Sequence, residues 1–485
     1  MNFKYVSKIL GMLISFMSAA MLLPAAWSIY REEWSSMEDL LVSMAIGVAV
    51  GVAFYIYGRK SEQEFYRREG LAVVSLGWIF GAAVGALPFY LSVEFVPGGY
   101  VNAYFEAMSG FTTTGSTVLS DIESLPEGIL LWRSFTQWLG GMGIVVLFVA
   151  VLPALGVEAK HLYKVEVPGI KKEGATPRIS ETASLLWKIY FGFTIAETVL
   201  LMIGGMTFFD AMNHTFTTLA TGGFSPKNAS IAHYDSLFIE LVIIVFMILV
   251  ATNFSLYVAA LRGRFRGFRK DTEYHVYLSL ILAASVLITI SLLLGGTYDS
   301  FGKAVRESVF QAVSIMTTTG YATANFDNWT PFAKVALVAM MFIGGCAGST
   351  GGSMKVARII VVFKTAILQI QKFFFPRMIK PVKMGKVTLP EETLHSVLGF
   401  VMLFIGIWVI GTLYMAFLGL DIVTAATSVI ATLGNIGPGL AGVGAIENFG
   451  WIPAAGKVFL SLCMVIGRLE VFTVLVLFVP AFWRE

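Results

Sequence analysis

Apolar stretches of about 20 or more residues, separated by short polar segments, run through almost the whole chain. At a rise of about 1.5 Å per residue, each stretch is long enough to cross the ~30 Å hydrocarbon core of a bilayer as a helix. The pattern therefore predicts an all-α polytopic membrane protein. Ten spanning helices are expected, at 4–29, 37–58, 70–94, 127–154, 182–206, 234–261, 273–296, 330–364, 391–419 and 453–482.

After the first two helices, each outer and inner helix pair encloses a short segment with small polar residues around a glycine. The segments read Phe-Thr-Thr-Thr-Gly-Ser at 111–116, Leu-Ala-Thr-Gly-Gly-Phe at 219–224, Thr-Thr-Thr-Gly-Tyr-Ala at 317–322 and Ala-Thr-Leu-Gly-Asn-Ile at 431–436. Separations of 107, 98 and 114 residues lie between their glycines, Gly115, Gly222, Gly320 and Gly434. A period of about a hundred residues predicts four internal repeats.

The stretch before each glycine can form a helix of only about 10 residues, which is too short to cross a bilayer. We expect re-entrant half-helices, because irregular backbone at membrane depth is tolerated only where it lines a water-filled cavity. Their C-terminal dipole ends favour a cation, and Thr-Gly backbone can turn carbonyl groups toward a shared axis as a cation filter. The predicted filter positions are Thr113, Thr114, Gly115, Ser116, Ala220, Thr221, Gly222, Gly223, Thr318, Thr319, Gly320, Tyr321, Thr432, Leu433, Gly434 and Asn435.

A glycine-rich run interrupts the third inner helix, about 24 residues after the third filter glycine. Glycine is disfavoured in a helix interior, so the run predicts a break just inside the filter, where it could partly block a pore. The alternative is a close crossing of small residues against neighbouring helices. The predicted gate positions in this run are Gly344, Gly345, Gly348, Ser349, Thr350, Gly351 and Gly352.

Arg468 lies midway along the last apolar stretch and is the second candidate for a gate. Arginine at membrane depth is costly and normally faces a cavity or a partner, so beneath a filter it would form an electrostatic barrier. The alternative is a structural ion pair with Glu470 or Glu197. A pair with Glu470 is disfavoured, because residues two positions apart do not face each other on a helix.

Charge sets the expected orientation. With the N-terminus inside, 26 of the 34 basic residues fall on the inner side against 12 of the 31 acidic residues, which is a strong positive-inside bias. This places both termini in the cytoplasm and the filter loops on the outer side. The content of 56% apolar and 13% charged residues excludes an ordinary soluble protein. The two cysteines exclude a disulfide framework, and no nucleophile–base or metal-ligand constellation indicates an enzyme.

These four loops, with one central glycine each, resemble the superfamily of K⁺ transporters. The length and layout are similar to those of the TrkH family of membrane subunits in bacterial Trk potassium uptake systems. The resemblance covers essentially the whole chain and implies K⁺ transport across the bacterial inner membrane, with no organic cofactor bound by this chain. It implies two extra N-terminal helices followed by four repeats, with boundaries at 1–68, 69–155, 156–268, 269–372 and 373–485.

The resemblance also assigns the gating role to the run at 344–353 and raises the expectation that Arg468 faces the pore. It implies a homodimer with one pore per protomer and a cytoplasmic nucleotide-binding regulator, TrkA. Gly115 favours K⁺, because relatives with serine at this position tend to pass Na⁺. A Na⁺- or H⁺-coupled K⁺ symporter on the same fold remains open, with Glu197 and Glu470 as the intramembrane carboxylates.

Overall fold

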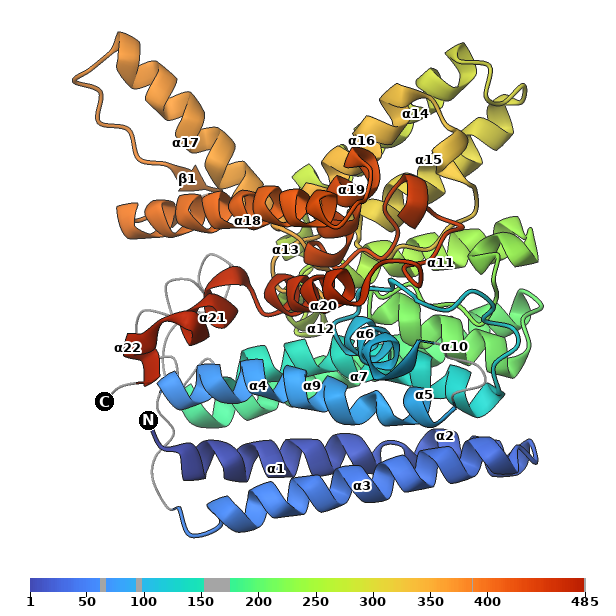
Figure 1. Cartoon of the computed structure of the whole chain (residues 1–485). Coiled ribbons are helices and arrows are strands. Elements are labelled where there is room, and N and C mark those ends of the chain that lie inside the picture. The colour runs from blue at the N-terminus through green and yellow to red at the C-terminus, as the bar shows by residue number, and fades with distance from the viewer. Residues whose placement is uncertain (62–66, 93–97, 152–174, 386, 484–485) are drawn as a thin grey trace.

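A computed structural model of the protein describes residues 1–61, 67–92, 98–151, 175–385 and 387–483. Its architecture is almost entirely helical (Figure 1). One two-residue strand pair, β1 (Lys383–Met384) with β2 (Val387–Thr388), is antiparallel with Met384 opposite Val387. The boundary expected at 155/156 lies outside the described residues.

Three N-terminal helices form a close hairpin along one edge of the molecule (Figure 1). The hairpin consists of α1 (Phe3–Ala19), α2 (Leu22–Tyr30) and α3 (Trp34–Gly58). Glycines allow the helices to approach each other, since a Cβ on Gly11 would lie 2.5 Å from the Gly51 carbonyl oxygen. Small residues at a crossing are the usual way in which membrane helices associate closely.

The segments expected as the first two repeats contain an outer helix, a half-helix and an inner helix in that order. Repeat 1 has α4 (Arg67–Gly85), α5 (Leu87–Leu91), α6 (Gly99–Phe111) and α7 (Glu127–Val151). Repeat 2 has α9 (Ala175–Ile203), α10 (Phe208–Leu219), η1 (Ser230–Tyr234), α11 (Leu237–Val250), α12 (Phe254–Leu261) and α13 (Arg266–Lys270).

The segments expected as the last two repeats have the same order of helices. Repeat 3 has α14 (Thr272–Leu294), α15 (Phe301–Met316), η2 (Phe326–Asn328), α16 (Pro331–Ile343) and α17 (Val356–Phe374). Repeat 4 has α18 (Glu391–Phe417), α19 (Ile422–Leu433), η3 (Ala441–Val443), α20 (Ala454–Arg468), α21 (Val471–Leu475), η4 (Val476–Phe478) and α22 (Pro480–Trp483).

Six helices in the described ranges are long and apolar enough to cross a membrane, or seven spans if the bent pair α11–α12 counts as one. The continuous inner helices expected at 234–261 and 453–482 are wrong. The helices α11 and α12 meet at 89°, and α20 ends at Arg468 before α21 begins. The break expected in the third inner helix is present, between Ile343 and Val356.

The half-helices α6, α10, α15 and α19 are 13, 12, 16 and 12 residues long, which is too short to span a bilayer. Their C-terminal halves are completely buried, including polar residues such as Ser109, Thr217 and Ser314. The C-terminal halves of the half-helices therefore lie in the interior of the molecule. Both cysteines, Cys346 and Cys463, are free and buried, as small apolar residues would be.

Candidate functional site

The four loops that follow the half-helices share one backbone conformation. Each begins with a residue whose φ lies between 51° and 59°: Thr113, Thr221, Thr318 and Asn435. Each has, two residues later, a glycine whose φ lies between 72° and 103°: Gly115, Gly223, Gly320 and Gly437. The amide of the residue between them donates to a carbonyl five residues earlier at 2.8 or 2.9 Å: Thr114 to Ser109, Gly222 to Thr217, Thr319 to Ser314 and Ile436 to Ala431. The loops are therefore equivalent in structure.

This equivalence changes the register expected from the sequence. In repeat 2 the left-handed glycine is Gly223 rather than Gly222, and in repeat 4 it is Gly437 rather than Gly434. Leu433 and Thr432 therefore belong to the last turn of α19 and precede the loop. The sequence Thr-Leu-Gly at 432–434 resembles Thr-Thr-Gly but lies three residues before the equivalent position. The glycine with the shared conformation is Gly437, which precedes Pro438.

The four loops close into a ring. A Cβ on Gly115 would lie 2.1 Å from the carbonyl oxygen of Gly222, in the next loop. The other three junctions are alike, from Gly223 to the oxygen of Thr319 at 2.0 Å, Gly320 to that of Ile436 at 1.9 Å, and Gly437 to that of Thr114 at 2.9 Å. Each glycine thus leaves room for a neighbouring backbone carbonyl, which no other residue could do without displacing it. The fourth loop returns to the first.

Side chains strengthen two of these junctions. Asn435 Nδ2 donates to Thr114 Oγ1 at 2.9 Å, and Ser116 Oγ donates to the Gly437 oxygen at 2.9 Å, so both bonds join loops 1 and 4. Tyr321 is directed to the second half-helix, where its hydroxyl donates to the His214 oxygen at 2.9 Å. Within the described ranges no three His, Cys, Asp or Glu side chains gather as metal ligands, so the ring offers backbone and hydroxyl oxygens.

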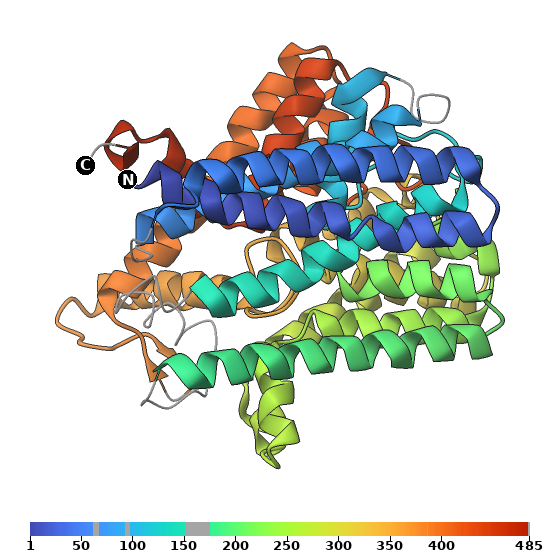
Figure 2. The ribbon, with the colours of Figure 1, turned by 90° about the horizontal axis from the view of Figure 1, so that it is seen from below.

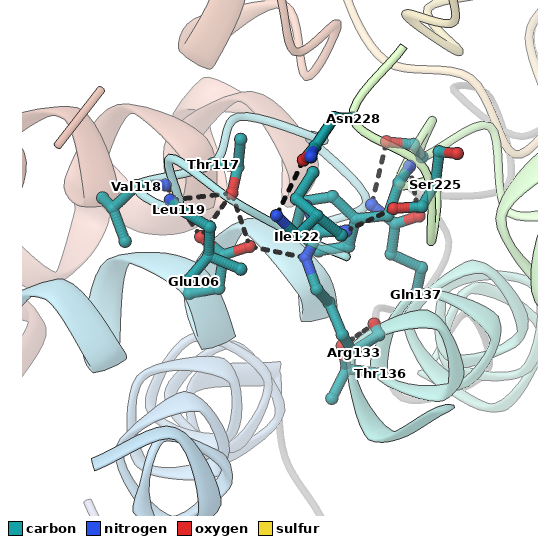
Figure 3. A network of polar contacts seen from close by, with 12 residues as sticks. Glu106, Thr117, Val118, Leu119, Ile122, Arg133, Thr136, Gln137, Ser225 and Asn228 are labelled. Atoms are coloured by element: carbon teal, nitrogen blue, oxygen red, sulfur yellow. Dashed lines mark hydrogen bonds and ion pairs between the residues drawn. The ribbon is translucent and has the colours of Figure 1, made fainter. Parts of the chain in front are cut away.

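A buried ion pair connects the exits of loops 1 and 2 (Figure 3). Arg133 Nε donates to Glu106 Oε1 at 2.7 Å, and Arg133 also donates to the Ser225 oxygen at 3.0 Å. Glu106 in turn accepts from Thr117 Oγ1 and from the Val118 amide, both at 2.9 Å. Both charged side chains are almost inaccessible to water, at 2% and 0% exposed. The sequence did not single out this pair, because residues 27 positions apart carry no pairing signal.

Gln137, one turn further along α7, holds the second loop from behind (Figure 3). Its Nε2 donates to the Gly222 oxygen at 2.8 Å, and its Oε1 accepts from the Phe224 amide at 3.2 Å. The two bonds lie on either side of Gly223. A side chain of α7 therefore holds the backbone of the second loop in place.

We expect Arg133→Ala to destabilise the protein by about 3–5 kcal/mol, because it leaves the buried Glu106 carboxylate without its counter-ion. The measurement is thermal unfolding of the detergent-solubilised protein. Arg31→Ala is the matched control, since Arg31 pairs with Glu127 at the same 2.7 Å but with side chains 49% and 26% exposed, and should cost only about 0–1 kcal/mol. Equal melting temperatures for the two variants would contradict the assigned role of the buried pair.

The glycine-rich segment between α16 and α17, residues 344–355, lies directly against the ring of four loops. It contains the gate positions expected from the sequence, and we call it the gating loop for that expectation. Gly352 donates its amide to Thr318 Oγ1 at 2.7 Å. A Cβ on the same glycine would lie 2.3 Å from the Gly434 oxygen. The gating loop therefore contacts the third and fourth loops of the ring.

The bend between α11 and α12 provides a second contact for the gating loop. Cys346 donates its amide to the Ala251 oxygen at 2.9 Å, and the Phe254 amide donates to the Gly348 oxygen at 3.1 Å. Carbonyl groups that lose their helical hydrogen bonds at the bend thus accept hydrogen bonds from amides of the gating loop. The sequence signal for this bend was the polar pair Thr252–Asn253 within an apolar run, where the Asn253 side chain caps α12.

Arg468, at the C-terminal end of α20, joins the gating loop to the first inner helix. It donates to the Thr350 oxygen at 2.5 Å and to the Gly140 oxygen at 3.3 Å, and it is 5% exposed. Glu470 pairs with Arg358 at 2.7 Å instead. Arg468 therefore connects the gating loop, α20 and α7.

Comparison with known proteins agrees with this architecture. The family model described as a cation transport protein matches residues 39–297 and 296–485. The Trk system potassium uptake proteins TrkH of Salmonella typhimurium and Halomonas elongata are 39% and 40% identical to the chain, over the whole of both sequences. The crystal structure of the potassium transporter TrkH from Vibrio parahaemolyticus superposes with a TM-score of 0.91 at 36% identity, and covers all of both chains.

The chain is thus an all-α membrane protein of the cation transporter class, and not an enzyme. Within that class, it belongs to the TrkH family.

Proposed function

We propose that this chain takes up K⁺ across the bacterial inner membrane through a pore whose filter is the ring of four loops. The observation that carries the proposal is the closed sequence of glycine–carbonyl junctions, which brings four uncharged, oxygen-rich backbone segments around one centre. Rings of backbone oxygens can replace the hydration shell of a monovalent cation. The names of the relatives, all potassium uptake proteins, support K⁺ as the transported ion.

The proposed filter comprises 113–116 and 318–321, as expected from the sequence. The shared backbone conformation favours 221–224 in the second repeat, one residue later than expected, and 435–438 in the fourth repeat, three residues later. The division into an N-terminal hairpin and four repeats is proposed with it, and the equivalent loops support that division.

The proposed gate is the gating loop together with Arg468. Its support is the position of the loop, which bonds to Thr318 on the filter side and to the bend after α11 on the other. The Arg468 guanidinium adds a buried positive charge that is held by backbone carbonyls. A positive charge beside a cation path raises the energy barrier to the ion. The barrier falls when the guanidinium moves away or its charge is compensated.

We further propose that both termini are cytoplasmic, that the protein forms a homodimer, and that a TrkA-type nucleotide-binding subunit regulates it. The word "system" in the names of the relatives supports a multi-subunit assembly. The exposed basic residues of the segment α12–α13 offer a cytoplasmic surface to such a partner: Arg262, Arg264, Arg266, Arg269 and Lys270.

A coupled symporter is the second candidate, and Glu197 is the observation that favours it. This carboxylate is fully buried in α9, and neither of its oxygens makes a hydrogen bond of normal geometry within the described residues, although Thr218 is a polar neighbour. A buried carboxylate with spare oxygens is a site where a proton or Na⁺ could bind.

The deciding experiment is flux in liposomes that contain only the purified chain, with a K⁺ gradient and no Na⁺, ATP or pH gradient. A pore predicts passive K⁺-selective flux, compared with protein-free liposomes. If the wild-type protein shows no K⁺ flux and the Arg468→Ala variant does, the wild-type pore is closed by its gate. Silence in both, relieved by an added Na⁺ or proton gradient, would reject the pore in favour of coupled transport.

A further inference from the structure

One buried carboxylate bonds both to the gating loop and to the helix that follows it. Glu273, the second residue of α14, is 1% exposed. Its Oε1 accepts hydrogen bonds from the Ala347 amide at 2.6 Å and from the Ala357 amide at 3.0 Å. The first donor lies within the gating loop and the second lies just beyond it, in the first turn of α17. A single oxygen atom therefore joins the gating loop to the first turn of α17.

The bond to Ala357 also serves as an N-terminal cap for α17. The N-cap residue of that helix, Lys355, provides no side-chain cap of its own. A carboxylate at a helix N-terminus is favoured by the free amides and by the dipole there. Glu273 supplies this group from a different helix, so that the start of α17, the gating loop and the start of α14 are held together.

In the part of the chain that the structure describes, only one of the two carboxylate oxygens of Glu273 is hydrogen-bonded, which makes the contact easier to release. Burial of a carboxylate is costly unless its oxygens are hydrogen-bonded. Glu273 Oε2 is buried and has no hydrogen-bond partner within the described residues. A small displacement that hydrates Oε2 would recover part of this cost, while it breaks the two bonds to Oε1.

Such a displacement can originate at the cytoplasmic surface. Asp271 caps α14 by accepting from the Tyr274 amide at 2.8 Å, and the basic helix α13 ends at the residue before it. The segment α12–α13 projects from the rest of the chain (Figure 2, yellow-green). Glu273 thus lies three residues from the exposed Lys270 and in direct contact with the gating loop.

We propose that Glu273 is a positioning residue that fastens the gating loop beneath the filter and passes movement of the α12–α13 segment to that loop. The inference rests on the proposed gate. It assigns a defined atom, Glu273 Oε1, to the closed position of the loop. Movement of α13 that withdraws this atom releases Ala347 and Ala357 together.

The test is basal K⁺ flux of Glu273→Ala in liposomes. Loss of hydrogen bonds to a charged group is expected to raise the open fraction about tenfold. Glu392→Ala is the matched control, because Glu392 is also the second residue of an outer helix but is exposed, and should behave as wild type. The K⁺ over Na⁺ permeability ratio should not change, since the filter is untouched, whereas general disruption of the structure would lower it.

Wild-type flux in Glu273→Ala, with raised flux in Arg468→Ala, would overturn the role of Glu273 and leave the gate standing. Wild-type flux in both variants would overturn the proposed gate itself. If Glu273→Ala does not fold, Glu273→Gln keeps an acceptor oxygen but loses the charge. Amide hydrogen exchange across 344–357 should then be faster than in wild type, and unchanged exchange would reject the proposal.

Discussion

Gly115→Ser is expected to lose most of the preference for K⁺ over Na⁺. The residue has φ +87°, and a Cβ would lie 2.1 Å from the Gly222 carbonyl oxygen, so serine is both strained and in collision with the next filter loop. A non-glycine residue in this backbone region costs about 1–3 kcal/mol, and the displaced carbonyl changes the size of the ring. Reversal potentials in mixed K⁺ and Na⁺ gradients measure the effect.

Gly205→Ser separates strain from collision. Gly205 also has a positive φ, +100°, but a Cβ there would meet no atom within 4 Å. This variant should therefore keep wild-type reversal potentials. Unchanged potentials in Gly115→Ser as well would show that Gly115 is not a filter residue.

Arg468→Ala should raise basal K⁺ flux strongly. The substitution removes a buried positive charge and both bonds that join the gating loop to α7, one to the Thr350 oxygen and one to the Gly140 oxygen. At an effective dielectric constant of 20, one unit charge acts on another 4 Å away with about 4 kcal/mol, so the barrier to a cation falls steeply. Tracer uptake into liposomes without the regulatory partner is the measurement.

Lys457→Ala is the matched control for this variant. Lys457 is a buried basic residue of the same helix, α20, and also donates to a backbone carbonyl, that of Gly450 at 2.9 Å. It lies 11 residues before Arg468, so basal flux should stay at the wild-type level. A well-folded Arg468→Ala protein with wild-type flux would reject Arg468 as part of the gate.

The sequence was sufficient to predict the half-helices, because polar Thr-Gly segments between apolar runs have few other solutions in a bilayer. It also located the break in the third inner helix, where repeated glycine opposes helix formation. The register of the fourth loop was wrong because residue pattern does not report φ. Only the backbone distinguishes Gly437, at +103°, from Gly434, which ends α19 in a right-handed conformation.

Tertiary partners could not be predicted for a different reason. The attachment of Glu273 to Ala347 involves a backbone amide, which every residue except proline carries, so no residue type marks it. The pair Glu106–Arg133 joins side chains that depend on how α6 packs on α7. Likewise, the 89° bend after α11 is stabilised by backbone hydrogen bonds with the gating loop. These bonds join segments about 100 residues apart in the sequence.

The junction between the fourth and first loops has a consequence for biogenesis. Ser116 bonds to Gly437 across 321 residues, and Asn435 bonds to Thr114 across the same separation. During synthesis from the N-terminus, the first three loops enter the membrane before their last neighbour exists. Until the fourth loop is synthesised, the ring of loops is therefore open. Polar groups that are buried in the finished protein remain uncovered on the side where the fourth loop will pack. Closure of the four-loop ring is thus a late, long-range event that follows insertion of nearly the entire polypeptide.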